Sequence, residues 1–348
     1  MQIAQIKLAG CVRRRLAEAV LIGLLAWPLA AVPATAQDLG QNSDFNKGGR
    51  TALQFLKIGI GARQAALGVA SIASVEDVNA IFWNPANLRG IETFESAFSY
   101  IRWLADMNYV AGAAGVRWNG VGVFALSIAA LDYGEIPEAL VSAGPNGDNR
   151  TGNTFSGSDL LIGAAFSRAF TDRLAIGIGV KMIREELFQY SVSQIAFDAG
   201  TSYLIGYNGT RLAMSAQNFS GSAKWLGDDS DRTEGYDVPL VYRIGLSTNL
   251  VGTDGFFDAG SAHRVVFSVE AINTNDFSER LHLGAEYQFA GLLALRGGYR
   301  INYEEGNLSL GVGLNPQFAG MEVRLDYAWV AYEFLDAPHR LTVSVALP

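Results

Sequence analysis

The chain has 348 residues, of which 49% are hydrophobic and 17% charged, which is enough for one large domain or two medium ones. Its formal net charge of -8 argues against a nucleic-acid-binding protein, because such proteins gather Lys and Arg into basic patches. No segment after residue 36 has the length and composition of a membrane-spanning helix. The apolar residues recur instead in short alternating runs, which is typical of strands.

Residues 1–36 have the pattern of a secretory signal peptide. Basic residues (Lys7 and Arg13 to Arg15) precede an apolar stretch from about Ala19 to Val32, and Ala34-Thr35-Ala36 is a small-x-small cleavage site. We therefore expect the mature chain to begin at Gln37.

An uncleaved N-terminal anchor is the alternative, and Glu18 beside the apolar stretch keeps it open. The single cysteine, Cys11, also lies in this segment. Residues 37–348 therefore contain no disulfide, no thiolate nucleophile and no cysteine metal ligand.

Residues 37–90 differ in pattern from the rest of the chain, and we interpret them as a lead-in followed by a plug segment. Residues 37–50 are polar, and Thr51 to Val69 is rich in Gly and Ala. Acidic residues at 76 and 77 precede the apolar residues 81–83, which suits the start of a helix. Pro85 should end that helix near Asn84. The sequence predicts one or two short helices and loops here, and no barrel wall.

From Glu92 onward the pattern repeats every second residue. Between Met321 and Trp329, for example, apolar residues alternate with Glu322, Arg324 and Asp326, as in a strand with one apolar face. Many runs approach the 9–11 residues that a tilted strand needs to cross a bilayer. Fourteen such segments are predicted, at about 92–103, 107–118, 120–131, 157–168, 173–184, 193–204, 210–218, 239–250, 262–272, 279–289, 292–303, 307–314, 321–331 and 338–347.

The fold class that these segments predict is all-β: a transmembrane antiparallel β-barrel over residues 91–348, in a bacterial outer membrane and surrounded by lipid. The longest gaps, 132–156 and 219–238, follow odd-numbered strands and should emerge on one side, with short turns on the other. Aromatic residues near strand ends fit interfacial girdles: Tyr100, Trp103, Trp118, Tyr287, Phe289, Tyr299, Tyr303, Tyr327 and Trp329. A soluble β-sandwich, which also alternates, is the competing interpretation.

Charged residues of both signs fall on the face of the strands that would line the lumen. In a closed lumen they should pair and cross-link the wall, or they should line a polar channel or a docking surface for the plug. The sequence leaves these alternatives open. The candidates are Lys181, Glu270, Glu286, Arg296, Arg300, Arg324 and Asp326.

Signals of catalysis or metal binding are weak. The three histidines, His263, His282 and His339, form no metal-type pair, and no G-x-S-x-G motif occurs. The acidic residues in the loop at 228–234 form no complete calcium loop, so a solvated loop is the simpler interpretation. We expect no enzyme activity, no cofactor and no bound metal.

Two N-terminal stretches resemble the PorV/PorQ family of outer-membrane proteins. They run from Phe55 to Gly68 (FLKIGIGARQAALG) and from Glu76 to Leu88 (EDVNAIFWNPANL), and residues 338–345 are similar to the closing strand of that family. The resemblance implies a fourteen-stranded barrel with its N-terminal segment packed inside and a role in type IX secretion. Secretion components and cargo C-terminal domains would then dock at the loops near 132–156 and 219–238.

The FadL-type barrels look like relatives of that family and carry a similar Asn-Pro-Ala motif. They imply the alternative function, a channel for uptake of hydrophobic small molecules.

Six residues of the N-terminal region form the candidate plug motif: Arg63, Phe82, Trp83, Asn84, Pro85 and Ala86. Asn84-Pro85 should stop a helix at a fixed place, and Ala86 permits close packing. Phe82 and Trp83 are large enough to fill a lumen or to anchor the segment to its wall, and Arg63 is placed to pair with a lumen carboxylate. The plug either stabilises the barrel or moves as a gate.

Overall fold

The computed structural model describes residues 49–139, 150–226, 235–318 and 320–347. The predicted signal segment 1–36 and the acidic loop at 228–234 lie outside this part of the chain. Within it, no helix is long and apolar enough to cross a bilayer.

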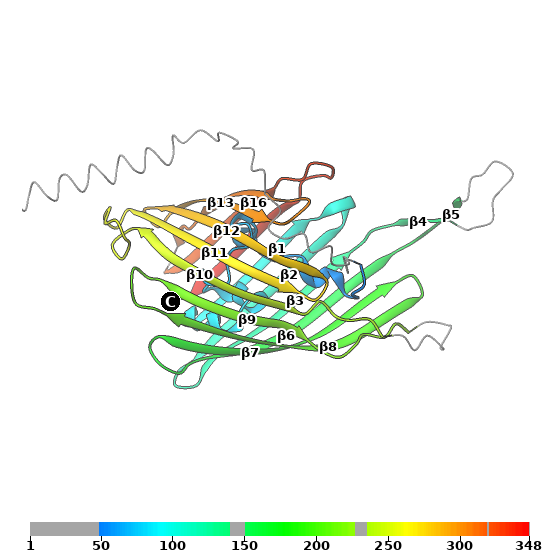
Figure 1. The fold of residues 1–348 in the computed structure, drawn as a ribbon, viewed down its shortest axis with the longest axis horizontal. Helices are drawn as coiled ribbons and strands as arrows, with labels where there is room; N and C mark the ends of the chain where they lie inside the picture. Colours follow the sequence, from blue (N-terminus) through cyan, green and yellow to red (C-terminus); the bar gives the residue numbers. More distant parts are fainter. Residues whose placement is uncertain (1–48, 140–149, 227–234, 319, 348) are drawn as a thin grey trace, which may run out of the picture.

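Fourteen antiparallel strands form a closed barrel (Figure 1). The first strand pairs with both the second and the last, and β14 pairs with β16, which completes the wall. All fourteen predicted segments are strands, so the predicted fold class is confirmed. The wall strands are β1 (Phe94–Arg102), β2 (Asn108–Trp118), β3 (Gly122–Asp132), β6 (Gly157–Ala169), β7 (Leu174–Leu187), β8 (Tyr190–Leu204), β9 (Arg211–Phe219), β10 (Val241–Val251), β11 (His263–Thr274), β12 (Phe277–Phe289), β13 (Leu293–Ile301), β14 (Leu308–Leu314), β16 (Met321–Val330) and β17 (His339–Leu347).

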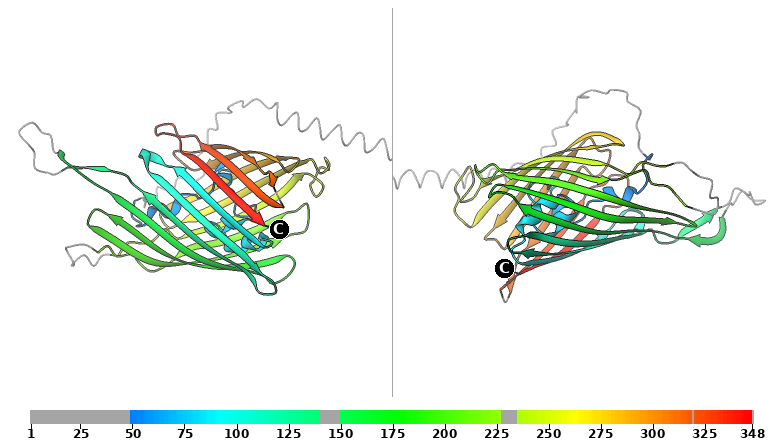
Figure 2. Two further views of the ribbon diagram at one scale, coloured as in Figure 1. Left: turned by 180° about the vertical axis from the view of Figure 1, so that it is seen from behind. Right: turned by 90° about the horizontal axis from the view of Figure 1, so that it is seen from below.

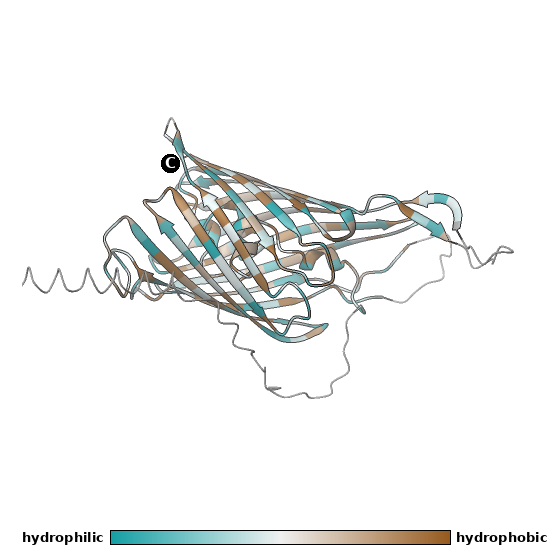
Figure 3. Ribbon diagram, turned by 90° about the horizontal axis from the view of Figure 1, so that it is seen from above, coloured by the Kyte–Doolittle hydropathy of each residue, from teal (hydrophilic) through white to brown (hydrophobic). Residues whose placement is uncertain are grey.

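The outer face of this wall is apolar. In β3, Phe124, Leu126 and Ile128 point outward, and Leu126 is 67% exposed, while Ala125 and Ser127 between them are buried. Hydrophobic and hydrophilic residues alternate along the strands in the same way around the barrel (Figure 3). An apolar surface of this extent is not found on a monomeric soluble protein, but it suits hydrocarbon.

The two ends of the barrel differ. At one end, which we call the turn end, β1 begins beside the last residue of β17, and the turns between β2 and β3 and between β12 and β13 are short. The latter turn has positive φ at both Ala290 (52°) and Gly291 (70°), the geometry that matches the twist of the flanking strands. The two-residue β15 (Gln317–Phe318) also lies at this end.

The opposite end, the loop end, carries the two longest connections, as the parity of the strands predicts. The hairpin of β4 (Ile136–Ala139) and β5 (Arg150–Phe155) projects from it (Figures 1 and 2). The short 3-10 turn η4 (Leu104–Asp106) connects β1 and β2 there. The connection between β9 and β10 leaves the barrel at the same end.

Residues 51–91, which we call the plug, lie inside the barrel (Figures 1 and 2). Thr51 bridges Asp237 at the loop end, and the plug leads into β1 at the turn end, so it runs through the lumen from one end to the other. Its helical parts are η1 (Gln54–Lys57), α2 (Ala62–Ala66), η2 (Val78–Phe82) and η3 (Pro85–Gly90).

The plug has four short helical turns where one or two were expected. Asp77 caps η2, because its side chain accepts a hydrogen bond from the N–H of Asn79 over 2.9 Å. Pro85 does more than end this turn. It also starts η3, since proline suits the first helical position and Asn84 before it supplies the cap.

The lumen has an apolar side and a polar side. Plug residues from Val75 to Ile91 pack against small side chains of β1, β2, β3 and β6, including Ala97, Ala113 and Ala125. Charged side chains of β10, β11, β12 and β16 contact the other side of the plug. The apolar side therefore seats the plug by packing, and the polar side fastens it by ion pairs.

Candidate functional site

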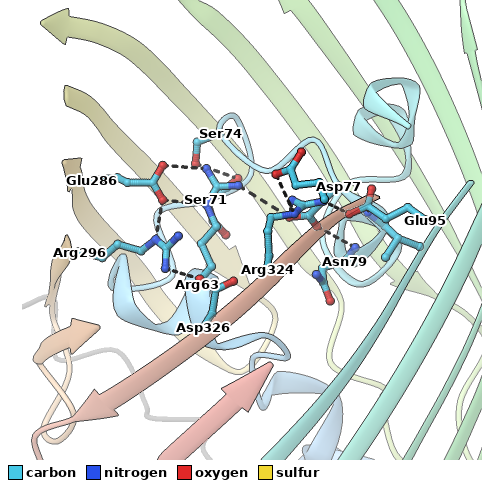
Figure 4. Close-up of polar contacts among 12 residues, drawn as sticks. Arg63, Ser71, Ser74, Asp77, Asn79, Glu95, Glu286, Arg296, Arg324 and Asp326 are labelled. Atoms are coloured by element: carbon cyan, nitrogen blue, oxygen red, sulfur yellow. Dashed lines mark hydrogen bonds and ion pairs between the residues drawn. The ribbon is translucent and has the colours of Figure 1, made fainter. Parts of the chain in front are cut away.

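A network of ion pairs joins the plug to the polar wall of the lumen (Figure 4). Arg63 in α2 donates through Nε and Nη2 to the two carboxylate oxygens of Glu286 in β12, over 2.9 and 3.0 Å. Arg296 in β13 donates to the same carboxylate over 2.5 Å and to Asp326 in β16 over 2.6 Å. Glu286 therefore holds one cation of the plug and one of the wall.

Arg324 in β16 extends this network toward the turn end. Its guanidinium lies 3.2 Å from Asp77 of the plug and also pairs with Glu95 in β1. Asp77 in turn is 3.7 Å from Arg63. Burial disfavours a charged Arg63, but Glu286 and Asp77 outweigh it and hold the pKa of Arg63 above its usual value. The plug is thus fastened to β12 through Arg63 and to β16 through Asp77.

The other predicted lumen residues also face inward. Glu270 in β11 accepts the backbone N–H groups of Ser71 and Ile72 in the plug, each over 3.0 Å, and pairs with Arg243 over 2.6 Å. Lys181 in β7 pairs with Asp198 over 2.8 Å. Six of the seven predicted lumen residues are therefore in ion pairs.

Arg300 in β13 is the exception. Its Nε donates to the carbonyl of Gly306 over 2.6 Å, and no carboxylate pairs with its guanidinium within the described part of the chain.

The residues of the Asn-Pro-Ala stretch dock on the wall. Asn84 accepts from the N–H of Ala86 over 3.1 Å and donates to the carbonyl of Thr201 over 3.0 Å. Ser167 donates to the carbonyl of Ala86 over 2.9 Å. Pro85 lies against Gly177, where any side chain on the wall would collide with the plug backbone. The close approach that Ala86 permits thus depends on a glycine across the interface.

Trp83 and Phe82 lie side by side in the lumen but differ in burial. The indole of Trp83 is buried, donates to the carbonyl of Ile60 over 3.0 Å and lies beneath the guanidinium of Arg243, 5.0 Å from the ring centroid. Phe82 is half-buried and lines a small cavity of about 50 Å³ between the plug and the wall. Both side chains line this cavity, and Trp83 also anchors the fold of the plug through its hydrogen bond and its contact with Arg243.

Asn84→Ala should lower the stability of the docked plug by about 1–2 kcal/mol, since it removes a cap and a bond to the wall. Asn84→Ser should lose less stability, because serine still caps η3. It is too short to reach Thr201, so only the bond to the wall is lost. Hydrogen exchange of the amides of residues 80–90 measures the difference. Equal protection in both variants would contradict these two roles for Asn84.

A separate contact fastens the plug at the loop end. Asp276, in the turn between β11 and β12, accepts from Lys57 over 2.6 Å and from the hydroxyl of Thr51 over 3.1 Å. Burial alone would raise the pKa of Asp276, but these donors outweigh it and lower that pKa.

The contact at Asp276 should weaken in acid. Because the pKa of Asp276 is lower in the folded protein, its stabilisation is fully present above the ordinary value of about 3.9 and is lost as the pH falls through the lowered value. Hydrogen exchange of residues 52–58, corrected for the intrinsic pH dependence, should therefore accelerate in that range. In Asp276→Asn the extra acceleration should be absent; if it persists, another group causes it.

Two further cavities lie on opposite sides of the plug. A polar cavity of about 710 Å³ opens at the turn end and is lined by Arg63, Asp77, Glu95 and Arg324, among others. A second cavity of about 140 Å³ lies between the plug and strands β10 to β17, toward the loop end. Among the described residues, the plug stands between these two cavities.

Two aromatic residues lie elsewhere than predicted. Trp103 and Tyr303 were expected in an interfacial girdle, but both line the 140 Å³ cavity inside the barrel. Strand ends place aromatic side chains on either face, and sequence position near an end does not distinguish lipid from lumen. Trp118 and Phe289, in contrast, are exposed on the outside.

Several residues of the site were not singled out from the sequence. They include Asp77, Glu95, Asp198, Arg243, Asp276 and Arg340. Arg243 and Arg340 lie on the polar face of their strands. The alternation of polar and apolar residues could therefore have identified both of them as lumen residues. Among the described residues no group of three or more His, Cys, Asp or Glu side chains is placed to hold a metal ion.

No family model and no curated protein sequence matches the chain. Solved structures do match. One crystal structure of the Pseudomonas putida toluene transporter TodX has a TM-score of 0.57 and 12% identity, covering 83% of this chain and 98% of TodX. A second TodX structure has a TM-score of 0.55 and 13% identity, covering 82% and 97%. This chain has the TodX fold.

A Pseudomonas aeruginosa FadL homologue also matches, with a TM-score of 0.49 and 11% identity over 83% of this chain and 97% of the homologue. The two TodX structures thus show that the chain has the fold of an outer-membrane β-barrel. These comparisons concern the fold, and the resemblance to PorV/PorQ remains a prediction from the sequence.

Proposed function

We propose that the chain is a non-enzymatic outer-membrane channel for small hydrophobic molecules, closed by the plug. The observation that carries the proposal is the plug itself, which runs the length of the lumen and is fastened to the wall at both ends. An open pore for polar solutes is incompatible with it. The TodX fold, whose namesake is a toluene transporter, supports a hydrophobic substrate.

The proposal requires the plug to move. The cavities on its two sides are separated by residues of the plug, so a substrate passes along the lumen only when these residues shift. On the polar side the plug is held by ion pairs, which can form again with other partners after the plug shifts. Apolar side chains of the plug, including Ile60, Ile81 and Phe82, line the small cavity beside the wall and offer a surface to a hydrophobic molecule.

Uptake of radiolabelled toluene by intact cells tests the proposal. Cells of an outer-membrane host that express the chain should accumulate toluene faster than cells that carry the empty vector. A polar solute of similar size, such as glycerol, should show no difference. Equal toluene uptake with and without the chain would contradict the proposal.

A second candidate function, in type IX-like secretion or surface display, is favoured by the loop end. Large apolar side chains are exposed there beyond the strands, among them Phe334 (82% exposed), Leu226 and Phe188. Such groups suit a protein surface that a partner covers, such as a secretion component or a cargo C-terminal domain. Affinity capture from native membranes should then recover those partners, whereas the channel alone predicts lipid without them.

A further inference from the structure

The 140 Å³ cavity toward the loop end has an unusual charge. Five cationic side chains line it: Lys57, Arg243, Arg280, Arg300 and Arg340. No Asp or Glu is among its described lining residues. Two of the five are neutralised from outside the lining, because Lys57 pairs with Asp276 and Arg243 with Glu270. Within the described part of the chain, no carboxylate pairs with the other three, which are arginines.

Arg340 in β17 is the clearest of the three. It is 6% exposed, and its Nε is buried without a hydrogen-bond partner within the described residues. Its guanidinium group lies over the ring of Trp103, with 5.3 Å between the guanidinium carbon and the ring centroid. Burial of a charge without a partner costs several kcal/mol, so such a group calls for an anion.

Arg280 and Arg300 strengthen the case, because both stack on the ring of Tyr303. Their guanidinium carbons lie 4.2 and 4.6 Å from the centroid of the same ring, Tyr303. Stacking on an aromatic face leaves the N–H edges of a guanidinium free for another acceptor. Two positive charges that stack on the same ring repel each other, and a negative group near both of them offsets this repulsion.

Two further polar residues, His282 and Tyr303, also line the cavity. His282 shares a hydrogen bond of 2.9 Å with the hydroxyl of Tyr303, while its Nδ1 is buried without a hydrogen bond. Apolar side chains, including Val241, Ile272 and Val330, complete the cavity. A volume of about 140 Å³, against roughly 30 Å³ for one liquid water, accommodates several waters or one small organic acid.

From these contacts we infer that the cavity binds an oxyanion, the carboxylate of a small organic acid, through Arg340, Arg280 and Arg300. A carboxylate is planar and accepts the two parallel hydrogen bonds that a guanidinium donates. The apolar and aromatic walls suit the carbon skeleton of the acid. The inferred anion binding does not depend on the proposed transport function, because the anion binds at equilibrium to the closed barrel.

Isothermal titration calorimetry of the full chain in detergent tests the inference, with sodium benzoate, sodium acetate and inorganic phosphate as probes at constant ionic strength. The wild type should bind one benzoate per chain, more tightly than acetate or phosphate. Arg340→Met should weaken benzoate binding by about tenfold or more, as expected for loss of a charged hydrogen-bond partner.

Arg102→Met is the matched control. Arg102 lies on β1 opposite His339, the residue before Arg340. It is exposed and pairs with Asp106, so its substitution removes one positive charge without changing the cavity. Benzoate affinity should be unchanged. If Arg340→Met fails to fold, Arg280→Met and Arg300→Met carry the same comparison, and benzoate should raise the unfolding temperature of the wild type more than that of either variant.

Absence of saturable binding of any probe to the wild type would overturn the inference. Equal benzoate affinity in the wild type and all three cavity variants would overturn it as well. Tighter binding of phosphate than of benzoate would overturn the assignment to an organic acid. Toluene uptake is measured separately, so a failed channel proposal and a failed anion site give different results.

Discussion

Alanine at Gly177 or Gly298 should drive the plug from the lumen while the wall stays closed. Both glycines face inward, and a Cβ at either position would overlap the plug backbone, at Pro85 and Ala86 or at Leu67 and Gly68. Backbone atoms cannot rotate away as a flexible side chain does, so the plug as a whole must shift. The strand hydrogen bonds of β7 and β13 do not involve the added methyl group.

A cysteine in the plug reports this movement. Ser71 is fully buried and its hydroxyl has no hydrogen-bond partner within the described residues, so Ser71→Cys should preserve the fold. With the wild-type wall, a water-soluble maleimide should label this cysteine slowly. With Gly177→Ala or Gly298→Ala it should label many times faster, and single-channel conductance should rise.

Gly179→Ala is the matched control. This glycine lies in the same strand as Gly177, but a Cβ there would meet its nearest neighbour at 3.5 Å, an ordinary contact. Labelling in this variant should match the wild type. Fast labelling of Ser71→Cys with an unaltered wall, or no acceleration at Gly177 and Gly298, would contradict the docking of the plug described above.

Glu286→Gln should be among the most destabilising single substitutions in the lumen. Glu286 is 2% exposed and neutralises Arg63 of the plug and Arg296 of the wall. Removal of its charge leaves two buried arginines short of a partner, and breaking a buried pair in this way costs about 3–5 kcal/mol. Urea unfolding from detergent micelles, followed by tryptophan fluorescence, should report this loss.

A double-mutant cycle separates the two partners of Glu286. Arg63→Met alone leaves Glu286 paired with Arg296 and Asp77 paired with Arg324, so we expect it to cost less than Glu286→Gln. The coupling between Arg63 and Glu286 should appear chiefly in the release of the plug, and that between Arg296 and Glu286 in unfolding of the wall. Glu186→Gln is a control on an exposed carboxylate and should have little effect.

The barrel could be predicted from the sequence because its surroundings constrain each strand. A strand between lipid and a crowded lumen must alternate, and all fourteen segments, such as Met321–Val330, carry that pattern. The inward position of Glu286, Arg296 and Asp326 follows from the same alternation. The parity of the long loops follows from the antiparallel order.

The partners of these residues could not be predicted. Arg63 and Glu286 are 223 positions apart, and nothing local favours this pair over Arg63 with Glu270. The course of the plug was also beyond reach, since its single helical turns are held by the wall and not by their own propensity. Of the three arginines of the cavity, only Arg300 was a candidate from the sequence, and their common lack of carboxylates among the described residues appears only in three dimensions.

In the proposed channel, the plug closes the lumen and must move for transport. A reversible lock tests this most directly. Ala66 of the plug and Ala328 of β16 belong to one buried cluster, and cysteines at both positions should form a disulfide under oxidation. Toluene uptake by cells that express this double variant should fall to the empty-vector level when oxidised and recover with reductant, whereas each single cysteine variant should be unaffected. Undiminished uptake through a barrel whose plug is shown to be cross-linked would contradict the account.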